Sequence, residues 1–166
     1  MTLRTTTTST SMSLPPIATL AQIKTARVKC LDFHPVRPHL LIGLYSGELL
    51  LQDFRANATL RSVQVTTQPV RAVRYFADGT FFAAGSDDGQ LRIYESYSMQ
   101  LRTTVKAHVD YIRSVALHPS APVLFTTGDD MVIRAWSFTK QGALTAEADL
   151  CGHEHFVMSI RCDAEG

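Results

Sequence analysis

A repeat of 42 residues is the feature that most limits what this chain of 166 residues can fold into. Val28, Val70 and Ile112 each open a similar apolar stretch at positions 42 apart, and a fourth stretch begins at Phe156-Val157-Met158. Each unit continues with an apolar run, a tight turn and a second apolar run. The turns are Tyr45-Ser46-Gly47, Asp87-Asp88-Gly89 and Asp129-Asp130-Met131. Because such units gain stability from their neighbours, the sequence predicts repeats that stack on one another.

The runs that follow the turns are short, rich in branched and aromatic residues, and bounded by turn formers, which predicts strands. No segment has a helical period over three turns, so the predicted fold is all-β. A period near 42 built from several short strands is typical of a WD-repeat β-propeller blade. Three complete repeats and the start of a fourth do not close a ring of four to eight blades. The predicted propeller is therefore incomplete, and is either a fragment, an incomplete gene product, or a protein that associates through its open edges.

The domain organisation follows from composition. Residues 1–16 are rich in Thr and Ser and are expected to be disordered. Residues 17–166 are expected to form the partial propeller, with repeats at about 26–66, 67–108 and 109–153 and a fourth from 154. Residues 1–31 contain basic and hydroxyl side chains and no acid, so an N-terminal targeting peptide is an alternative. No window is long and apolar enough to predict a membrane span.

Several classes of function have no support in the sequence. The formal charge of +1 gives no basic field for nucleic acid, and the three cysteines form no CxxC pair. Metal ligands do not cluster, and the motifs of nucleotide-binding proteins and hydrolases are absent. We therefore predict no enzyme, no cofactor, no metal and no nucleic-acid partner, and an enzyme that uses the channel is the less favoured alternative. His34 and His118 precede Pro at equivalent places, which predicts a structural role.

The third repeat resembles the WD-repeat family in detail. It has an Ala-His variant of the family's Gly-His pair, followed by the residues of a buried hydrogen-bond relay: His108, Thr126, Asp130 and Trp136. A buried imidazole between a carboxylate and a hydroxyl, with an indole N–H beside them, satisfies every polar group. The second repeat keeps only Asp88, and the first has Ser46 and Gln52 instead. Those two repeats are expected to depend more on apolar packing.

Charged residues recur in the same register. Lys29, Arg71 and Arg113 each follow the first apolar residue of a unit, and Tyr45, Asp87 and Asp129 share a position in the turns. Equivalent positions on adjacent blades form an arc, so cations and carboxylates are each expected to gather on one face, apart from each other. That separation suits a ligand with a negative and a positive end, such as a peptide C-terminus that carries lysines. Solvated strand ends and ordinary turn residues are the alternative.

A narrower resemblance comes from RVKCLDFHPVRPHLLIGLYSG, QVTTQPVRAVRYF, AHVDYIRSVALHPSAPVLFTTGDD and GHEHFVMSI, which are similar to the coatomer beta-prime family over about residues 20–161. The resemblance implies a vesicle-coat subunit, cytoplasmic and peripheral on Golgi membranes, that works with other coatomer subunits in Golgi-to-ER retrograde transport. It also implies binding of dilysine signals (KKxx or KxKxx) at cargo C-termini. The implied carboxylate-binding residues are Arg27, Lys29, Tyr45, Arg71 and Arg113, and the implied lysine-binding residues are Asp87, Asp110 and Asp129. The alternative is a WD-repeat scaffold of another complex, without tail recognition.

Overall fold

The computed structural model describes residues 27–163. The disordered segment predicted for residues 1–16 lies outside this range, as does most of the region considered as a targeting peptide. Residues 27–163 form twelve strands and no helix. The prediction of an all-β fold is therefore confirmed. None of the described residues belongs to a helix that is long and apolar enough to cross a membrane.

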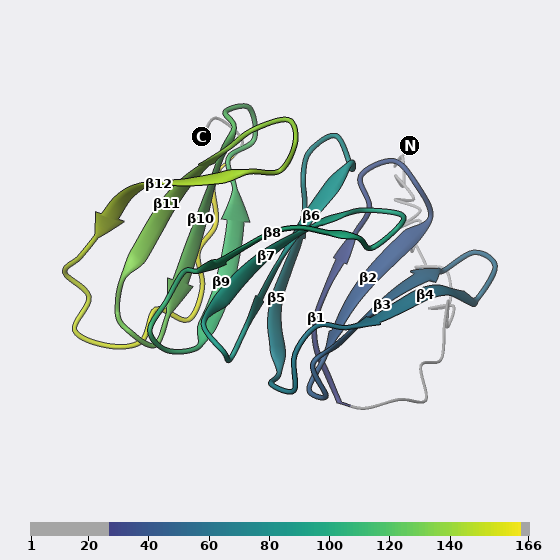
Figure 1. The fold of residues 1–166 in the computed structure, drawn as a ribbon, viewed down its shortest axis with the longest axis horizontal. Helices are drawn as coiled ribbons and strands as arrows, with labels where there is room; N and C mark the ends of the chain where they lie inside the picture. The colour runs from purple at the N-terminus through teal and green to yellow at the C-terminus, as the bar shows by residue number, and fades with distance from the viewer. Residues whose placement is uncertain (1–26, 164–166) are drawn as a thin grey trace, which may run out of the picture.

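The strands make three four-stranded sheets, and each sheet is antiparallel with its strands in chain order (Figure 1). The first sheet contains β1 (Val28–Phe33), β2 (His39–Leu44), β3 (Glu48–Asp53) and β4 (Ala58–Gln64). The second contains β5 (Val70–Tyr75), β6 (Phe81–Ser86), β7 (Gln90–Glu95) and β8 (Leu101–Lys106). The third contains β9 (Ile112–Leu117), β10 (Val123–Gly128), β11 (Ile133–Phe138) and β12 (Leu144–Leu150).

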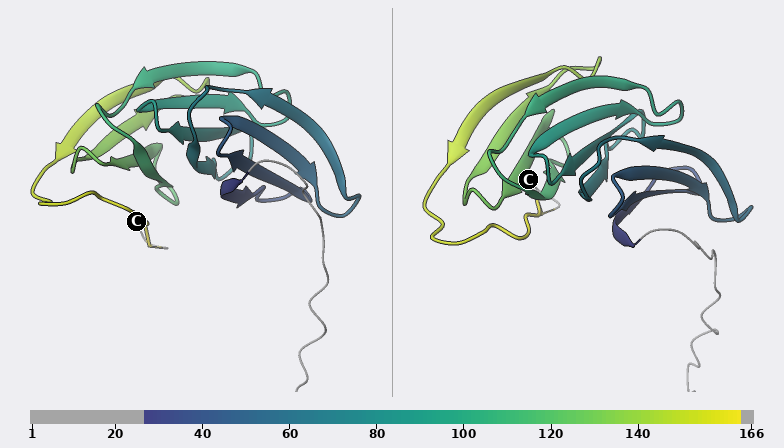
Figure 2. Two further views of the ribbon diagram at one scale, coloured as in Figure 1. Left: turned by 90° about the horizontal axis from the view of Figure 1, so that it is seen from below. Right: turned by 60° about the horizontal axis from the view of Figure 1, so that its bottom comes forward.

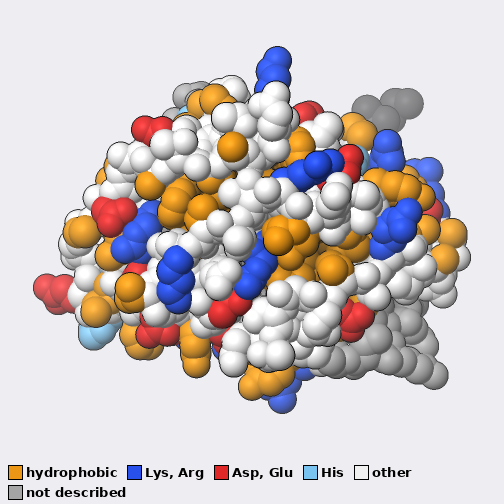
Figure 3. Space-filling model, viewed as in Figure 1, with side chains coloured by type: hydrophobic (Ala, Val, Ile, Leu, Met, Phe, Trp, Pro, Cys, Tyr) orange, Lys and Arg blue, Asp and Glu red, His pale blue; other side chains and the backbone are white. Residues whose placement is uncertain are grey.

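The sheets stand side by side in an arc (Figure 2), with β1, β5 and β9 along its concave side and β4, β8 and β12 along its convex side. The inner strand β5 packs against both β1 and β9. On the convex side, charged side chains of both signs are interspersed with small groups of hydrophobic ones (Figure 3). The outer strands have mostly exposed or half-buried residues, so the main cores lie between neighbouring sheets.

Two apolar clusters join the sheets. One lies between the first and second sheets, where Leu41 and Leu51 pack with Val73 and Phe82. The other lies between the second and third sheets and contains Ile93, Ile112, Leu124 and Trp136 among its members. Full burial of one such side chain stabilises the fold by about 1.5–3 kcal/mol. The stacking predicted from the repeat is thus the main source of stability.

Glycine makes the close approach of the sheets feasible. A Cβ atom at Gly43 would lie 3.0 Å from Cγ1 of Val70, and one at Gly85 would lie 2.5 Å from Cγ2 of Ile112. Real Cβ atoms rarely come so close to a neighbour, so the sheets would have to separate. The first two sheets therefore keep glycine near the end of the second strand, where the inner strand of the next sheet passes. The third sheet has Thr127 at the equivalent position, and its hydroxyl donates to the carbonyl of Val157.

Two histidines close equivalent loops at the ends of β1 and β9. The Nδ1 atom of His34 accepts hydrogen bonds from the backbone N–H groups of Val36 and Arg37, at 3.2 and 3.1 Å. The Nδ1 atom of His118 accepts from Ser120 and Ala121, at 3.2 and 3.0 Å. Their predicted structural role is confirmed.

The start of the fourth repeat follows the edge of the third sheet. Residues 151–163 form no strand, yet the backbone N–H of Val157 donates to Gly128 at 3.2 Å and its carbonyl accepts from Thr127 at 2.8 Å. Val157 is buried, as are Val70 and Ile112 at the equivalent place. This segment therefore lies where the inner strand of a next sheet would lie.

Candidate functional site

Four side chains in the third sheet form a continuous hydrogen-bonded relay. The ring of His108 lies 2.7 Å from Asp130 through Nδ1 and 2.8 Å from Thr126 through Nε2. The indole N–H of Trp136 donates to the same Thr126 hydroxyl at 3.0 Å. His108 and Thr126 are fully buried. The relay ties the loop after β8 to the β10–β11 turn and to β11.

The direction of the relay follows from the donor inventory. A carboxylate has no proton to give, so Nδ1–H of His108 donates to Asp130 and Nε2 accepts from the hydroxyl of Thr126. Burial lowers the pKa of His108 more than the carboxylate of Asp130 raises it, which keeps the imidazole neutral. Arg134 donates to the other oxygen of Asp130 at 2.8 Å. The relay is therefore a satisfied structural network with no group left free for chemistry.

The second sheet replaces the relay with an ion pair and an aromatic stack. Arg92 donates to Asp88 at 2.6 Å and to the Ser86 hydroxyl at 2.8 Å. Tyr94 stacks on Phe82 with ring centroids 5.3 Å apart. Burial opposes ionisation of Asp88, but the hydrogen bonds from Arg92 and Ser86 outweigh it and hold the pKa at about 2. Asp88 therefore stabilises the fold as a carboxylate.

We expect Asp88→Asn to lower the free energy of unfolding by about 2 kcal/mol near neutral pH. The folded pKa lies below the unfolded value of 3.8, so this contribution is present above about pH 4 and is lost as the pH falls towards about 2. Urea unfolding of both chains over this range measures the difference. A difference that stays constant down to the lowest pH would contradict the assignment.

The turns between the second and third strands of the sheets form one face of the molecule. The first residue of each turn donates its backbone N–H to the residue just before the inner strand: Tyr45 to Arg27, Asp87 to Pro69, and Asp129 to Tyr111, at 2.8, 2.9 and 3.0 Å. The residues predicted from register are thus equivalent in space. This face is seen in the left panel of Figure 2, which views the arc from below.

Cations and carboxylates on this face are paired with each other. Arg71 binds both oxygens of Asp87, with its Nη2 atom 2.7 Å from Oδ2. Arg113 binds both oxygens of Asp129, with its Nε atom 2.5 Å from Oδ1. The carboxylates lie beneath the arginines, with 3% and 5% of their side chains exposed. The predicted separation of cations and anions is therefore wrong, and both oxygens of Asp87 and of Asp129 are already occupied.

Aromatic rings separate the cations. The ring of Tyr111 lies between Arg71 and Arg113, each 5.5 Å from its centroid. The ring of Tyr45 carries Arg27 at 5.1 Å and Lys29 at 6.0 Å. We call these six residues, Arg27, Lys29, Tyr45, Arg71, Tyr111 and Arg113, the arginine–tyrosine face. Tyr45 and Tyr111 are 49% and 39% exposed, so the rings are available to a partner.

Register alone missed Tyr111, because the equivalent residues are Arg27 and Pro69 and no aromatic residue repeats there. It also missed the link between Asp32 and Arg74, which stand 42 positions apart and form an ion pair at 3.3 Å between adjacent sheets. The sequence contains a signal for this ion pair, because residues of opposite charge stand at equivalent positions of two neighbouring repeats.

Two further predictions concern Asp110, as a lysine-binding residue, and the absence of a metal site. Asp110 is exposed, and its carboxylate accepts the backbone N–H of Tyr111 at 2.8 Å. Across residues 27–163, no group of three or more His, Cys, Asp or Glu residues is placed to hold a metal ion.

Comparison with known proteins finds WD repeats in this chain and supports the fold. The WD domain, G-beta repeat family matches residues 58–95 and 99–137. Periodic tryptophan protein 2 of Saccharomyces cerevisiae is 32% identical over 115 residues, which are 69% of this chain and 12% of that protein. Nuclear distribution protein nudF of Aspergillus terreus is 35% identical over 81 residues, 49% of this chain and 18% of that protein. The chain thus spans between 12% and 18% of the length of these relatives.

A solved structure supports the same fold. The structure of U3-55K superposes with a TM-score of 0.78 at 17% identity, and covers 84% of this chain and 44% of that chain. The likeness at this identity concerns the fold alone.

The resemblance to the coatomer beta-prime family is wrong as an identification. The relatives named above are a periodic tryptophan protein and a nuclear distribution protein rather than coat subunits. The implied Golgi localisation, retrograde transport, coat partners and cargo tails are withdrawn with it. The physical reason is that the motifs behind the resemblance contain residues that hold a blade together, such as His118 in its loop and the Gly128-Asp129-Asp130 turn, so they do not specify a binding partner. The three stacked sheets, the His–Asp–Thr–Trp relay and the two matched repeats together show that the described residues form three consecutive blades of a WD-repeat β-propeller fold.

Proposed function

We propose that this chain serves as a protein-interaction scaffold and that a partner protein binds across the arginine–tyrosine face. WD-repeat blades provide a rigid surface built from turns, and tyrosine and arginine are the residues that most often carry binding energy at protein interfaces. The observation that carries the proposal is the half-exposed ring of Tyr111 between two arginines that are themselves held by buried carboxylates.

The pairing of Arg71 and Arg113 with aspartates supports this function in a specific way. Each guanidinium is fixed by two hydrogen bonds, so the side chain loses little conformational freedom when a partner docks. The hydrogen bonds that Arg113 donates to Asp129 also raise the pKa of Arg113, which keeps it charged. A preorganised surface of this kind favours binding without a large entropic cost.

The charge of the face indicates the chemistry of the partner. Arg27 and Lys29 form no ion pair with any residue between 27 and 163, whereas Arg71 and Arg113 are neutralised. The remaining positive charge lies around Tyr45. We therefore propose a partner surface that carries acidic residues beside an apolar contact for the tyrosine rings.

Affinity capture with variant chains tests the proposal. We expect Tyr45→Ala to reduce the retention of the proteins that bind the immobilised 166-residue chain by about tenfold, as the loss of a hot-spot side chain does. Leu101→Ala is a matched control, because Leu101 is 47% exposed and lies on β8, on the convex side of the arc and away from the arginine–tyrosine face. Quantitative mass spectrometry compares the captured proteins. Identical retention by the wild type and Tyr45→Ala would rule out this face as the contact surface.

A further inference from the structure

A hollow of about 610 Å³ lies between the second and third sheets, at the end of the molecule opposite the arginine–tyrosine face. The loops between β5 and β6, β9 and β10, and β11 and β12 surround it. Its apolar wall consists of Phe76, Phe81, Phe138 and Pro122, and its rim carries Asp78 and Lys140. The volume is within the range of sites that take an organic group of considerable size, roughly 300–1,000 Å³.

The aromatic wall is rigid. Phe76 is only 4% exposed, and its ring centroid lies 4.4 Å from that of Phe138 and 6.0 Å from that of Phe81. These rings belong to the core between the sheets on one side and reach the hollow on the other. An apolar side chain that enters the hollow would therefore meet a surface that is already ordered.

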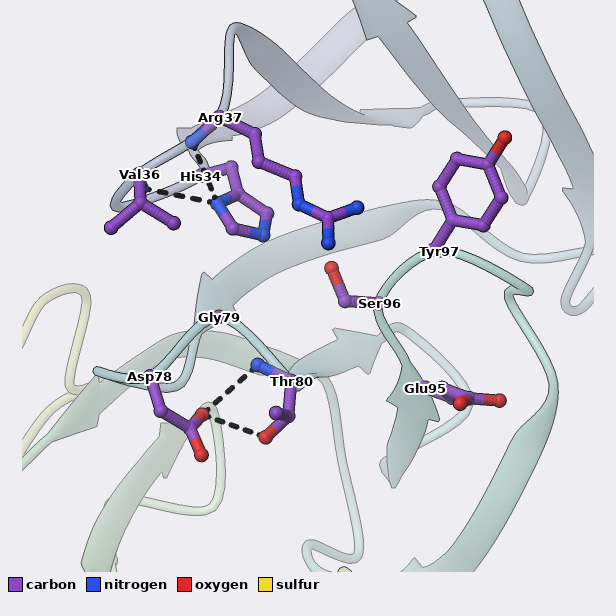
Figure 4. A pocket seen from close by; sticks show the side chains of 9 residues that line it. All are labelled: His34, Val36, Arg37, Asp78, Gly79, Thr80, Glu95, Ser96 and Tyr97. Atoms are coloured by element: carbon purple, nitrogen blue, oxygen red, sulfur yellow. Dashed lines mark hydrogen bonds between the residues drawn. The ribbon is translucent and has the colours of Figure 1, made fainter.

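A second hollow of about 250 Å³ lies next to the first, between the first and second sheets (Figure 4). Asp78, Thr80 and Glu95 line both hollows and separate them. In Figure 4 the guanidinium group of Arg37 points into the space between His34 and Tyr97. We call the two neighbouring hollows together the groove.

Asp78 gives this groove its charge preference. The backbone N–H and the hydroxyl of Thr80 both donate to its Oδ1 atom, at 2.9 and 2.7 Å, which fixes the carboxylate. Its Oδ2 atom has no hydrogen-bond partner among residues 27–163, and the carboxylate forms no ion pair with them. Glu95, by contrast, is paired with Arg102 at 3.1 Å. A fixed carboxylate with one free oxygen beside an aromatic wall favours a cation next to an apolar group.

We propose that this groove docks a peptide segment of a partner protein in which a large aliphatic or aromatic residue stands next to a lysine or arginine. The apolar side chain fills the hollow against Phe76, Phe81 and Phe138, and the cation pairs with the free oxygen of Asp78. The site is independent of the arginine–tyrosine face, because no residue is shared between the two.

Synthetic hexapeptides with blocked ends test the proposal on the 15N-labelled 166-residue chain. The probe is Gly-Ser-Leu-Arg-Ser-Gly, and the comparison peptides replace Arg with Glu or Leu with Ser. The Leu-Arg peptide is expected to shift the amide signals of Asp78, Thr80 and Thr139 and to bind about tenfold more tightly than either comparison peptide. Asp78→Asn, an exposed substitution, is expected to abolish the preference for Arg over Glu.

A control variant on the opposite face keeps the outcome interpretable. Tyr45→Ala on the opposite face is expected to leave the titration unchanged, so failure of the proposed scaffold face and failure of this groove are distinguishable. No amide shift in the groove with the Leu-Arg peptide, or equal binding of the Arg and Glu peptides to the wild-type chain, would overturn the proposal.

Discussion

Replacing Phe82 with alanine is expected to lower the free energy of unfolding of the chain by about 3–5 kcal/mol. Phe82 is fully buried between the first and second sheets. Its ring is stacked on Tyr94 at 5.3 Å and meets the edge of Tyr75 at 5.9 Å. Truncation removes the largest of the fully buried side chains among the described residues and leaves a cavity that rings held by two strands cannot close.

Phe81 provides the matched control. It is the adjacent residue on β6, points to the other side of the sheet, and is only partly buried at the wall of the groove. Phe81→Ala is expected to cost less than half as much, because water already reaches that ring. Urea unfolding monitored by circular dichroism gives both values. Equal losses would mean that the contact between the first two sheets contributes no more than the groove wall does.

The fold could be predicted from the sequence because the 42-residue repeat places turns and strands at equivalent positions in each unit. The predicted turns are present, with Gly47 and Gly89 at φ 84° and 71° and Met131 at φ 64° in the same place. A positive φ of this kind costs little for glycine and is uncommon for other residues, so the turn residues marked strand ends reliably. The strands on each side of the turns then follow from their short apolar runs.

The ion pairs between arginine and aspartate on the arginine–tyrosine face could not be predicted from the sequence, because they depend on a local irregularity in the pairing of the inner strands. A register shift interrupts each inner strand pair where the cation stands, between Val28 and Cys30 and between Val70 and Ala72. The extra residue of this bulge is the cation itself, and its side chain points towards the turn of the same sheet. Arg71 therefore binds Asp87, and the cations do not form an arc separate from the carboxylates. The residue types of an inner strand do not predict such a bulge.

The same geometry explains the difference between the first blade and the other two. Where the second and third blades pair an arginine with an aspartate, the first places Lys29 over the ring of Tyr45. A cation–π contact of this kind leaves the charge of the lysine unneutralised. In the first blade, tyrosine replaces the aspartate of the turn and lysine replaces the arginine of the inner strand. The structural ion pair is therefore replaced by an exposed, positively charged contact surface, and this is why we expect Tyr45 to matter for binding.

The second large effect on stability is expected from loss of the hydrogen-bonded relay in the third blade. His108→Ala is expected to lower the free energy of unfolding by about 3 kcal/mol, because the buried Asp130 carboxylate loses a hydrogen-bond donor and the Thr126 hydroxyl loses its acceptor. His118→Ala is the control, since that ring accepts two backbone hydrogen bonds in a loop near the surface and its loss should cost about 1 kcal/mol.

The pH dependence separates the relay from simple loss of volume. The folded-state pKa of His108 is lowered below 6.5, so the stability it contributes as a neutral ring is present above that pH and declines as the pH falls below it. The difference between wild type and His108→Ala should therefore shrink from about pH 7.5 to about pH 5.5, because the unfolded wild-type chain takes up a proton that the folded chain resists. Denaturant unfolding at several pH values gives this difference directly. A difference that is the same at every pH would assign the loss to packing alone, and would mean that the imidazole is not held neutral between Asp130 and Thr126.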